Sequence, residues 1–157
     1  MTHKIRPSLW FDDQLAEALE FYKGIFPDFE LYESDQLPDD SAVGTVRYAR
    51  FRLNGLDFAA FNGGPMFKFS EAISFEIIVE TQDEIDHYWN RLTDGGEESQ
   101  CGWLKDPFGV SWQVVPQTLF DLFVDPDPDR ARRAIEAMLT MQKLDIAALN
   151  AAADGTA

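Results

Sequence analysis

The sequence contains few of the residues that form covalent cross-links and metal clusters, with one cysteine and two histidines among 157 residues. A single cysteine, Cys101, cannot form an intrachain disulfide, and it excludes a cysteine-rich zinc site. A chain of this length buries roughly 68–70% of its unfolded surface. We therefore expect it to fold without disulfides or a structural metal.

Positive charge is also scarce, because 13 lysines and arginines stand against 28 aspartates and glutamates, for a formal net charge of −15. Nucleic acids and anionic membrane surfaces select basic patches, so this balance argues against both as partners. No apolar run approaches about 18 residues, and no basic segment precedes an apolar one, so neither a membrane span nor a targeting signal is predicted. We expect a cytoplasmic protein whose acidic surface leaves room for a cationic ligand.

Glycine patterns that bind phosphates or dinucleotides are missing as well, since Gly63-Gly64 and Gly95-Gly96 lack the required spacing. Cys101 has no neighbouring histidine that would activate it as a thiolate nucleophile. We therefore predict no cofactor. A hydrophobic core is nonetheless expected, because 45% of the residues are hydrophobic and 13 are phenylalanine.

The first part of the chain predicts one strand, one helix and three further strands, at residues 5–11, 15–26, 29–33, 43–53 and 56–61. Asp12 or Asp13 can cap the helix. Asn54-Gly55 is a strong hairpin signal, because both turn positions favour positive φ. The polar loop at 34–41 is the expected mobile flap. Cross-strand pairing with acids, or alternatively ligand binding, is expected of Arg47, Arg50 and Arg52.

The same order of elements begins again after residue 72. Alternation over residues 72–80 places Phe75 and Ile77 on one face and Ser74 and Glu76 on the other. A helix around residues 85–92, capped by Thr81 or Asp83, precedes a hairpin with arms at 101–105 and 110–115. Its turn is Asp106-Pro107-Phe108-Gly109, in which proline pre-sets φ and glycine accepts a positive φ.

The last part of the chain predicts helices, at 119–124, from Asp127-Pro128 to about residue 143, and at 146–153. We expect these helices to pack over a sheet edge or across a dimer interface, without a chemical role. The expected organisation is one domain over residues 1–116, built of two modules at about 4–65 and 70–116. A helical extension over residues 117–157 follows it.

Three segments in this order resemble a known family: LWFDDQLAEALEFYKGIFP, FNGGPMFKFSEAISF and CGWLKDPFGVSWQVVP. With the repeated order of strands and helix, they resemble the vicinal oxygen chelate superfamily, which includes glyoxalase I, extradiol dioxygenases and bleomycin-binding proteins. Within it they look like the PhnB-like branch, often labelled 3-demethylubiquinone-9 3-methyltransferase. The resemblance covers residues 4–153. It implies an α+β fold of paired βαβββ modules around a cup, usually in a homodimer.

Metal-dependent members of that superfamily take four ligands, typically histidine and glutamate, from four strands of the cup. Aligning the DP-x-G turn gives the corresponding positions here as Gln113, Asn62, Ala72 or its neighbour, and either Arg6 or Ser8. Amide and hydroxyl groups are weak donors to zinc, iron or manganese. His3 and His87 lie off these positions. We therefore predict a degenerate site that holds no metal.

Strand parity predicts the side chains that line the cup: Ser8, Trp10, Asn62, Ser74, Glu76, Ser111 and Gln113. Trp103 is expected nearby and completes the predicted ligand-binding set. Tryptophans among neutral polar groups suit a flat or amphipathic molecule, although they can equally fill a core. Glu76 is the one carboxylate predicted inside. It is the candidate general base or partner of a cationic group, with a salt bridge to a neighbouring arginine as the structural alternative.

These observations favour a metal-free member of the superfamily that binds a small molecule, cationic or aromatic, with activity undefined. The first alternative is an enzyme, either metal-dependent or methyl-transferring. A nucleotide-like methyl donor usually sits on a glycine-rich turn within alternating strands and helices, and this chain has neither. The second alternative is an interaction module whose cup is filled by its own side chains.

Overall fold

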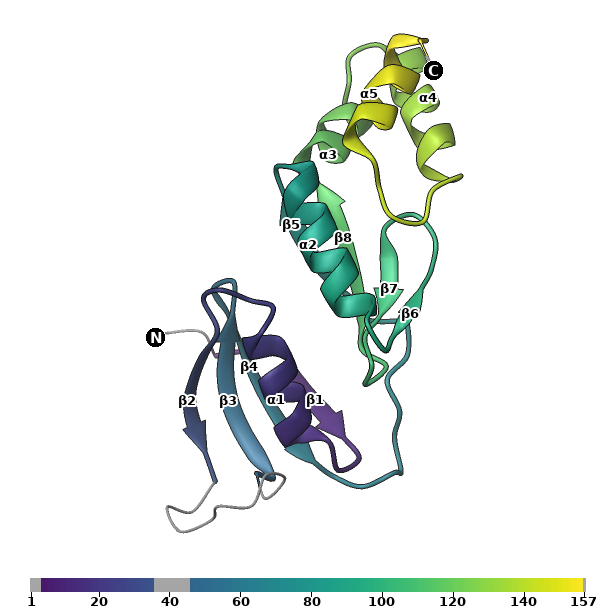
Figure 1. The fold of residues 1–157 in the computed structure, drawn as a ribbon. Coiled ribbons are helices and arrows are strands. Elements are labelled where there is room, and N and C mark those ends of the chain that lie inside the picture. Colours follow the sequence, from purple (N-terminus) through teal and green to yellow (C-terminus); the bar gives the residue numbers. More distant parts are fainter. Residues whose placement is uncertain (1–3, 36–45, 157) are drawn as a thin grey trace. The chain divides into compact units, whose positions relative to one another are not determined.

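The structure, a computed structural model, describes residues 4–35 and 46–156 and divides into two compact units, Met1–Phe69 and Ser70–Ala157 (Figure 1). The first unit contains β1 (Ser8–Phe11), α1 (Leu15–Lys23), β2 (Glu30–Ser34), β3 (Tyr48–Leu53) and β4 (Leu56–Asn62). The second contains β5 (Phe75–Val79), α2 (Gln82–Thr93), β6 (Glu97–Glu98), β7 (Trp103–Lys105) and β8 (Ser111–Pro116). Three helices follow in it, α3 (Gln117–Phe123), α4 (Pro128–Met138) and α5 (Ile146–Asp154).

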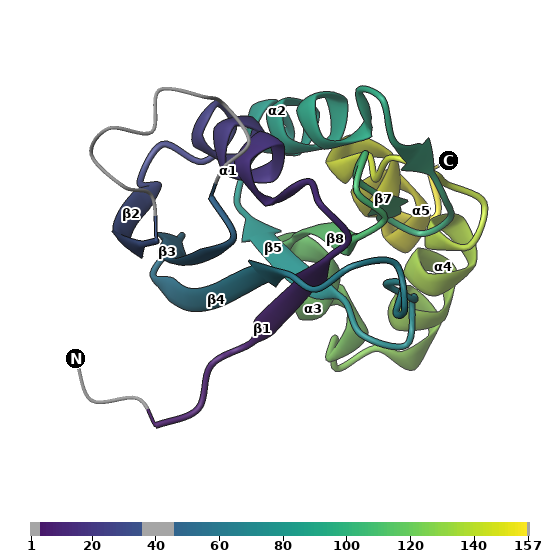
Figure 2. The same ribbon diagram turned by 90° about the horizontal axis from the view of Figure 1, so that it is seen from below.

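Each unit has a four-stranded mixed sheet of the same design, with strand orders β1-β4-β3-β2 and β5-β8-β7-β6. In both, the first strand runs parallel to the last strand, and the other neighbours are antiparallel. One helix packs on its own sheet in each unit, α1 in the first and α2 in the second (Figure 1 and Figure 2). The α+β fold with repeated βαβββ order is therefore confirmed.

Aromatic side chains fill the space between α1 and the first sheet. Phe51 of β3 is fully buried and stacks on Phe58 of β4, with ring centroids 5.4 Å apart. Tyr22 of α1 stacks on the same Phe51 at 6.4 Å. Each fully buried aromatic ring removes a large apolar area from water, and stacked pairs add roughly 0.5–1.5 kcal/mol to that burial. This cluster fixes the helix-covered face of the first sheet.

The start of α1 corrects one prediction, because neither Asp12 nor Asp13 caps this helix. Gln14 stands at the N-cap and its side chain makes no capping hydrogen bond. The backbone N–H of Leu15 instead donates to Asn62 Oδ1 at 3.0 Å, while Asn62 Nδ2 donates to the Val46 carbonyl at 3.3 Å. The amide that satisfies the helix start therefore comes from the end of β4, a long way along the chain.

Replacing Asn62 with alanine is expected to lower the free energy of unfolding by about 1 kcal/mol, the usual cost of losing a helix cap. For a chain of this size the melting temperature should fall by roughly 2–4 °C, measured by circular dichroism. Asn90→Ala is the matched control, because this exposed asparagine of α2 has no hydrogen bond to any described residue. Equal melting temperatures for the two variants would contradict the capping role.

Other local predictions are confirmed by the backbone. Asn54 and Gly55 both have positive φ, 47° and 83°, and Gly109 has a φ of 89°. Thr81 is the N-cap of α2, and its Oγ1 accepts from the Glu84 N–H at 3.2 Å. The expected flap at 34–41 lies mostly outside the described residues. Within the described ranges, no helix is long and apolar enough to cross a membrane.

The C-terminal helices share a hydrophobic core with the end of β8. Val115 packs in one buried cluster with side chains of all three helices and of the segment before α5, namely Leu119, Leu122, Ala134, Leu144, Leu149 and Ala153. Gln82 of α2 donates to the Leu144 carbonyl and accepts from the Ile146 N–H. These helices therefore pack against the end of β8, an inner strand of the second sheet, and against α2, and not over a sheet edge. Packing across a dimer interface stays a prediction.

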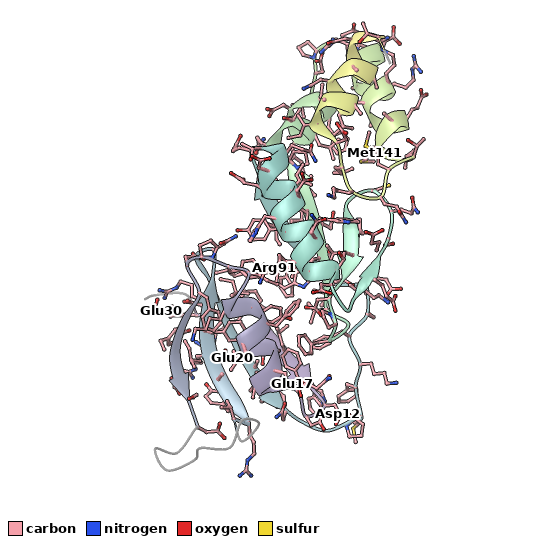
Figure 3. All side chains as sticks on the ribbon, in the orientation of Figure 1. Asp12, Glu17, Glu20, Glu30, Arg91 and Met141 are labelled. Atoms are coloured by element: carbon pink, nitrogen blue, oxygen red, sulfur yellow. The ribbon has the colours of Figure 1, made fainter. Side chains whose placement is uncertain are left out.

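Helix α4 ends at Met138, earlier than the predicted end near residue 143. The chain then turns at Met141, which Figure 3 labels. The carbonyls of Met141 and Gln142 accept from the N–H groups of Cys101 and Gly102, both at 2.8 Å. Lys143 pairs with Asp86 of α2 at 3.0 Å, and this ammonium lowers the pKa of the Asp86 carboxyl. These tertiary bonds compete with continuation of the helix.

Candidate functional site

One face of the second sheet is covered by α2. We call the opposite face of this sheet the open face. Phe75, Ile77 and Val79 lie on the covered face of β5, in agreement with the predicted alternation. The strand register places Glu76, Gln113 and Trp103 in one row across the open face. A second row on that face contains Glu97, Lys105 and Ser111.

Gln113, at the centre of the first row, is bonded to Ser74. Its Nε2 donates to Ser74 Oγ at 2.9 Å, and both side chains are half-buried. Trp103 lies beside Gln113 on β7 and is also half-buried. The structure thus brings together these three residues, all of which the sequence predicted for the ligand site.

Glu76 corrects the expectation of a buried carboxylate, because the structure exposes it to solvent. β5 is the edge strand of its sheet, and strand parity identifies the face of a residue but not what covers that face. The Glu76 side chain makes no hydrogen bond or ion pair with any residue in the described ranges, so the alternative of a salt bridge to an arginine is not found there. An exposed side chain at this position is not the buried carboxylate that the sequence predicted as a general base.

A pocket of about 170 Å³ lies at the β6–β7–β8 side of the open face. Its lining consists of Glu71, Glu97, Glu98, Ser99, Trp103, Leu104, Lys105 and Ser111. Lys105 Nζ pairs with Glu71 Oε2 at 3.2 Å. Trp103 and Ser111 were predicted from the sequence, whereas the glutamates and Lys105 were missed. β6 is only two residues long and is too short to show an alternating pattern.

Ser111 has an unusual environment within this pocket. The residue is 2% exposed, and its Oγ finds no hydrogen-bond partner among the described residues. Buried hydroxyls are nearly always hydrogen-bonded, because an unpaired one loses its bonds to water without replacement. The Ser111 hydroxyl is therefore available to a group that enters the pocket.

Two of the predicted ligand-binding residues, Trp10 and Ser8, lie in β1 of the first unit. Trp10 Nε1 donates to the Gly64 carbonyl at 2.8 Å, and its ring contacts Phe61 and Phe67 edge to face at 5.1 and 5.0 Å. A Cβ at Gly63 would lie 2.4 Å from the Trp10 ring, so the group that approaches this backbone closely is the indole. Ser8 is exposed, at the opposite end of β1.

The arginines of β3 pair with acids across the first sheet, as the first of the two expectations for them states. Arg50 Nη1 lies 3.1 Å from Glu33 Oε2 of β2. Arg52 bonds Glu30 at 2.9 Å and the buried Asp57 at 2.8 Å. The hydrogen bond and charge of Asp57 raise the pKa of the Arg52 guanidinium. These guanidinium groups hold β2, β3 and β4 together.

No group of three or more histidine, cysteine, aspartate or glutamate side chains that could hold a metal ion occurs within residues 4–35 and 46–156. Gln113 Nε2 donates to Ser74 Oγ, and the Asn62 amide is bonded to backbone groups. His87 is an exposed residue of α2. The neutral amides and hydroxyl at these positions do not fit a tightly held zinc, iron or manganese ion.

Comparison with known proteins gives relatives of the same fold. A putative 3-demethylubiquinone-9 3-methyltransferase, PhnB protein, from Bacillus cereus is 30% identical, with a TM-score of 0.64, over 73% of this chain and 99% of that one. PA1353 from Pseudomonas aeruginosa is 20% identical, with a TM-score of 0.60, over 73% and 98% of the two chains. The fosfomycin resistance protein FosX from Listeria monocytogenes, complexed with Mn(II) and sulfate, is 16% identical, with a TM-score of 0.53, over 74% and 90%.

No protein of curated function matched the sequence. The family model described as 3-demethylubiquinone-9 3-methyltransferase matches residues 3–115, which is more than half of the chain. Helices α3, α4 and α5 lie beyond the matched residues. A domain titled glyoxylase/bleomycin resistance protein/dioxygenase, from Frankia, shares the fold with a TM-score of 0.52. The chain belongs to the PhnB-like family, described as 3-demethylubiquinone-9 3-methyltransferase.

Proposed function

We propose that this chain binds a small organic molecule on the open face of its second sheet and does so without a metal ion. The hydrogen bond between Gln113 Nε2 and Ser74 Oγ carries the proposal. Gln113 stands where the family resemblance expects a glutamate ligand, and its neutral amide is engaged by a neighbouring hydroxyl. Such a pair offers hydrogen bonds to an organic ligand and little to a divalent cation.

The surroundings of this pair support the ligand. Trp103 presents a large, half-buried ring next to Gln113, and the buried Ser111 hydroxyl lies along the same strand. Small-molecule sites typically combine an apolar or aromatic wall with a few placed polar groups. The ring, the amide and the hydroxyl together fit a small molecule that has both aromatic or apolar surface and hydrogen-bonding groups.

Two measurements test this proposal on the purified protein. We expect elemental analysis to find far less than one divalent transition metal per chain, and added Mn²⁺ or Zn²⁺ to leave the melting temperature unchanged. We expect a metabolite library, screened by thermal shift and tryptophan fluorescence, to give ligands whose affinity falls about tenfold in Gln113→Ala, the loss of one or two hydrogen bonds. The control is Gln117→Ala, a half-buried glutamine of α3 whose side chain donates to Asp121 Oδ1.

Either measurement is able to reject the proposal. One firmly held metal ion per chain would overturn the proposal that the site is metal-free, and a library without any ligand would overturn the binding role.

The second candidate function is methyl transfer, which the description of the matching family favours. Saturable binding of S-adenosylmethionine, followed by transfer of its methyl group to a phenolic acceptor, would replace our proposal. We also propose a cytoplasmic homodimer, and sedimentation equilibrium tests the dimer.

A further inference from the structure

We propose that the pocket between β6, β7 and β8 is a binding site for a primary ammonium group, so that the ligand of this protein is a compact amine. The inference rests on the proposed function, because it assigns a ligand class to the same open face. It is carried by three features of the described pocket: an excess of carboxylates, a buried hydroxyl without a partner, and an aromatic wall beside them.

The carboxylates outnumber the cations around the pocket. Glu71, Glu97 and Glu98 line it together with a single cationic residue, Lys105. Lys105 is already paired with Glu71, and the backbone N–H of Glu71 and this ammonium lower the pKa of the Glu71 carboxyl, which therefore stays ionised. Two negative charges remain once this pair is subtracted. A cation that enters the pocket gains their attraction, whereas an anion meets repulsion.

Glu97 is the carboxylate best placed for such a cation. The register Glu97↔Lys105↔Ser111 puts it in the same row of the open face as the buried hydroxyl. The Glu97 side chain makes no hydrogen bond or ion pair within the described part of the chain. Glu98 is partly engaged, since its Oε1 accepts from Trp89 Nε1 at 3.0 Å. An N–H donor from a ligand would therefore find a free carboxylate at Glu97.

Ser111 gives an independent reason to expect a hydrogen-bonding ligand. Ser111 lines the pocket, and its Oγ is buried and has no partner among residues that the structure describes. A primary ammonium has three N–H donors, so one group can reach Ser111 Oγ and a glutamate oxygen together. Trp103 lines the same pocket, and a cation over the face of its ring gains cation–π attraction. A quaternary ammonium would satisfy the ring but not the hydroxyl.

The size of the pocket limits the amine. Its volume of about 170 Å³ is close to the roughly 150 Å³ of a protein cavity that holds benzene. A single ring or a short chain that carries one ammonium group fits this space. Benzylamine is therefore a suitable probe, with benzyl alcohol as its neutral analogue and benzoate as its anionic one.

The experiment is isothermal titration of the full-length protein with the three probes. We expect benzylamine to bind at least about tenfold more tightly than benzyl alcohol, a difference of about 1.4 kcal/mol, and benzoate to show no binding. Glu97→Gln should remove most of the preference for benzylamine. Ser111→Ala should weaken benzylamine about fivefold while leaving the melting temperature unchanged or raised, because it removes a buried hydroxyl that has no partner.

Asp83→Asn is the matched charge control. This exposed carboxylate of the second unit stands in the first turn of α2, a helix of 12 residues whose other end leads to β6. At 1.5 Å per residue, roughly 18 Å of helix separates the two ends. We expect benzylamine to bind this variant as tightly as the wild type.

The outcomes separate this inference from the proposed function. Equal affinity for benzylamine and benzyl alcohol, or an unchanged preference in Glu97→Gln, would overturn the ammonium site. If benzylamine fails but a neutral or anionic library compound binds with dependence on Gln113, the ammonium site is rejected and the proposed function stands. If no compound of any charge binds, both are rejected.

Discussion

Replacing Asp106 with alanine is expected to lower the free energy of unfolding by about 4 kcal/mol, because hydrogen bonds to a buried ionised group contribute roughly 1.5–3 kcal/mol each. Asp106 is 3% exposed. Its Oδ1 accepts from the N–H groups of Phe108 and Val110, at 2.9 and 3.0 Å, and its Oδ2 accepts from Trp112 Nε1 at 2.9 Å. Alanine would leave all three donors without this acceptor in a buried turn.

The measurement is thermal and urea unfolding of the full-length chain. A loss of about 4 kcal/mol corresponds to a fall in melting temperature of roughly 8–16 °C at this chain length. The melting temperature of Asp106→Asn should lie between those of the wild type and Asp106→Ala. The asparagine amide keeps one acceptor oxygen but turns an N–H donor toward a backbone or indole N–H group. Asp94→Ala, at an exposed carboxylate that bonds no described residue, is the control. Equal melting temperatures for Asp106→Ala and Asp94→Ala would refute the role assigned to Asp106.

The DPFG turn illustrates what local sequence is able to predict. Pro107 and Gly109 define the turn by their own backbone preferences, so the hairpin is predictable from a few adjacent residues. The alternation along β5 and β8 is equally local, because a strand repeats its faces every two residues. The role of the Asp106 side chain cannot be predicted from adjacent residues alone. It depends on the burial of the turn and on the position of Trp112.

Features that depend on contacts between distant segments escaped prediction. The start of α1 is satisfied by Asn62, which is 47 positions away from Leu15. The end of α4 is fixed by bonds to Cys101 and Gly102. Both assignments made from sequence used the nearest suitable residues, which is the only information that periodicity and capping rules contain. The competing tertiary hydrogen bonds become visible only when the segments are assembled.

The candidate site was likewise predicted only in those features that depend on local sequence. Parity predicted that Ser111 and Gln113 share a face, with Trp103 nearby, and the register places all three residues on one face. Parity gave no information about depth, so it placed the exposed Glu76 inside a cavity. It also missed Glu97, because the pairing of β6 with β7 creates that part of the pocket. The residues that give the pocket its charge therefore come from the shortest strand and from the segment before β5.

The second large effect is expected at Gly96, where alanine should cost about 3 kcal/mol of unfolding free energy, within the upper range for forced overpacking. A Cβ at this position would lie 2.2 Å from the Lys105 carbonyl oxygen and 3.0 Å from the Asp106 carbonyl carbon. Both obstacles are backbone atoms, which do not move aside as a flexible side chain does. The methyl group must therefore push β6 away from β7, separating Glu97 from Lys105 and Ser111.

Gly109→Ala is the control for this substitution, because it adds the same methyl group to the same hairpin region with no atom within 4 Å. Its φ of 89° makes alanine strained there by about 1–2 kcal/mol, but nothing displaces β6. We expect Gly96→Ala to have the lower melting temperature and to lose affinity for benzylamine, while Gly109→Ala keeps that affinity. If both variants bind benzylamine as the wild type does, the close packing of β6 on β7 does not position the pocket.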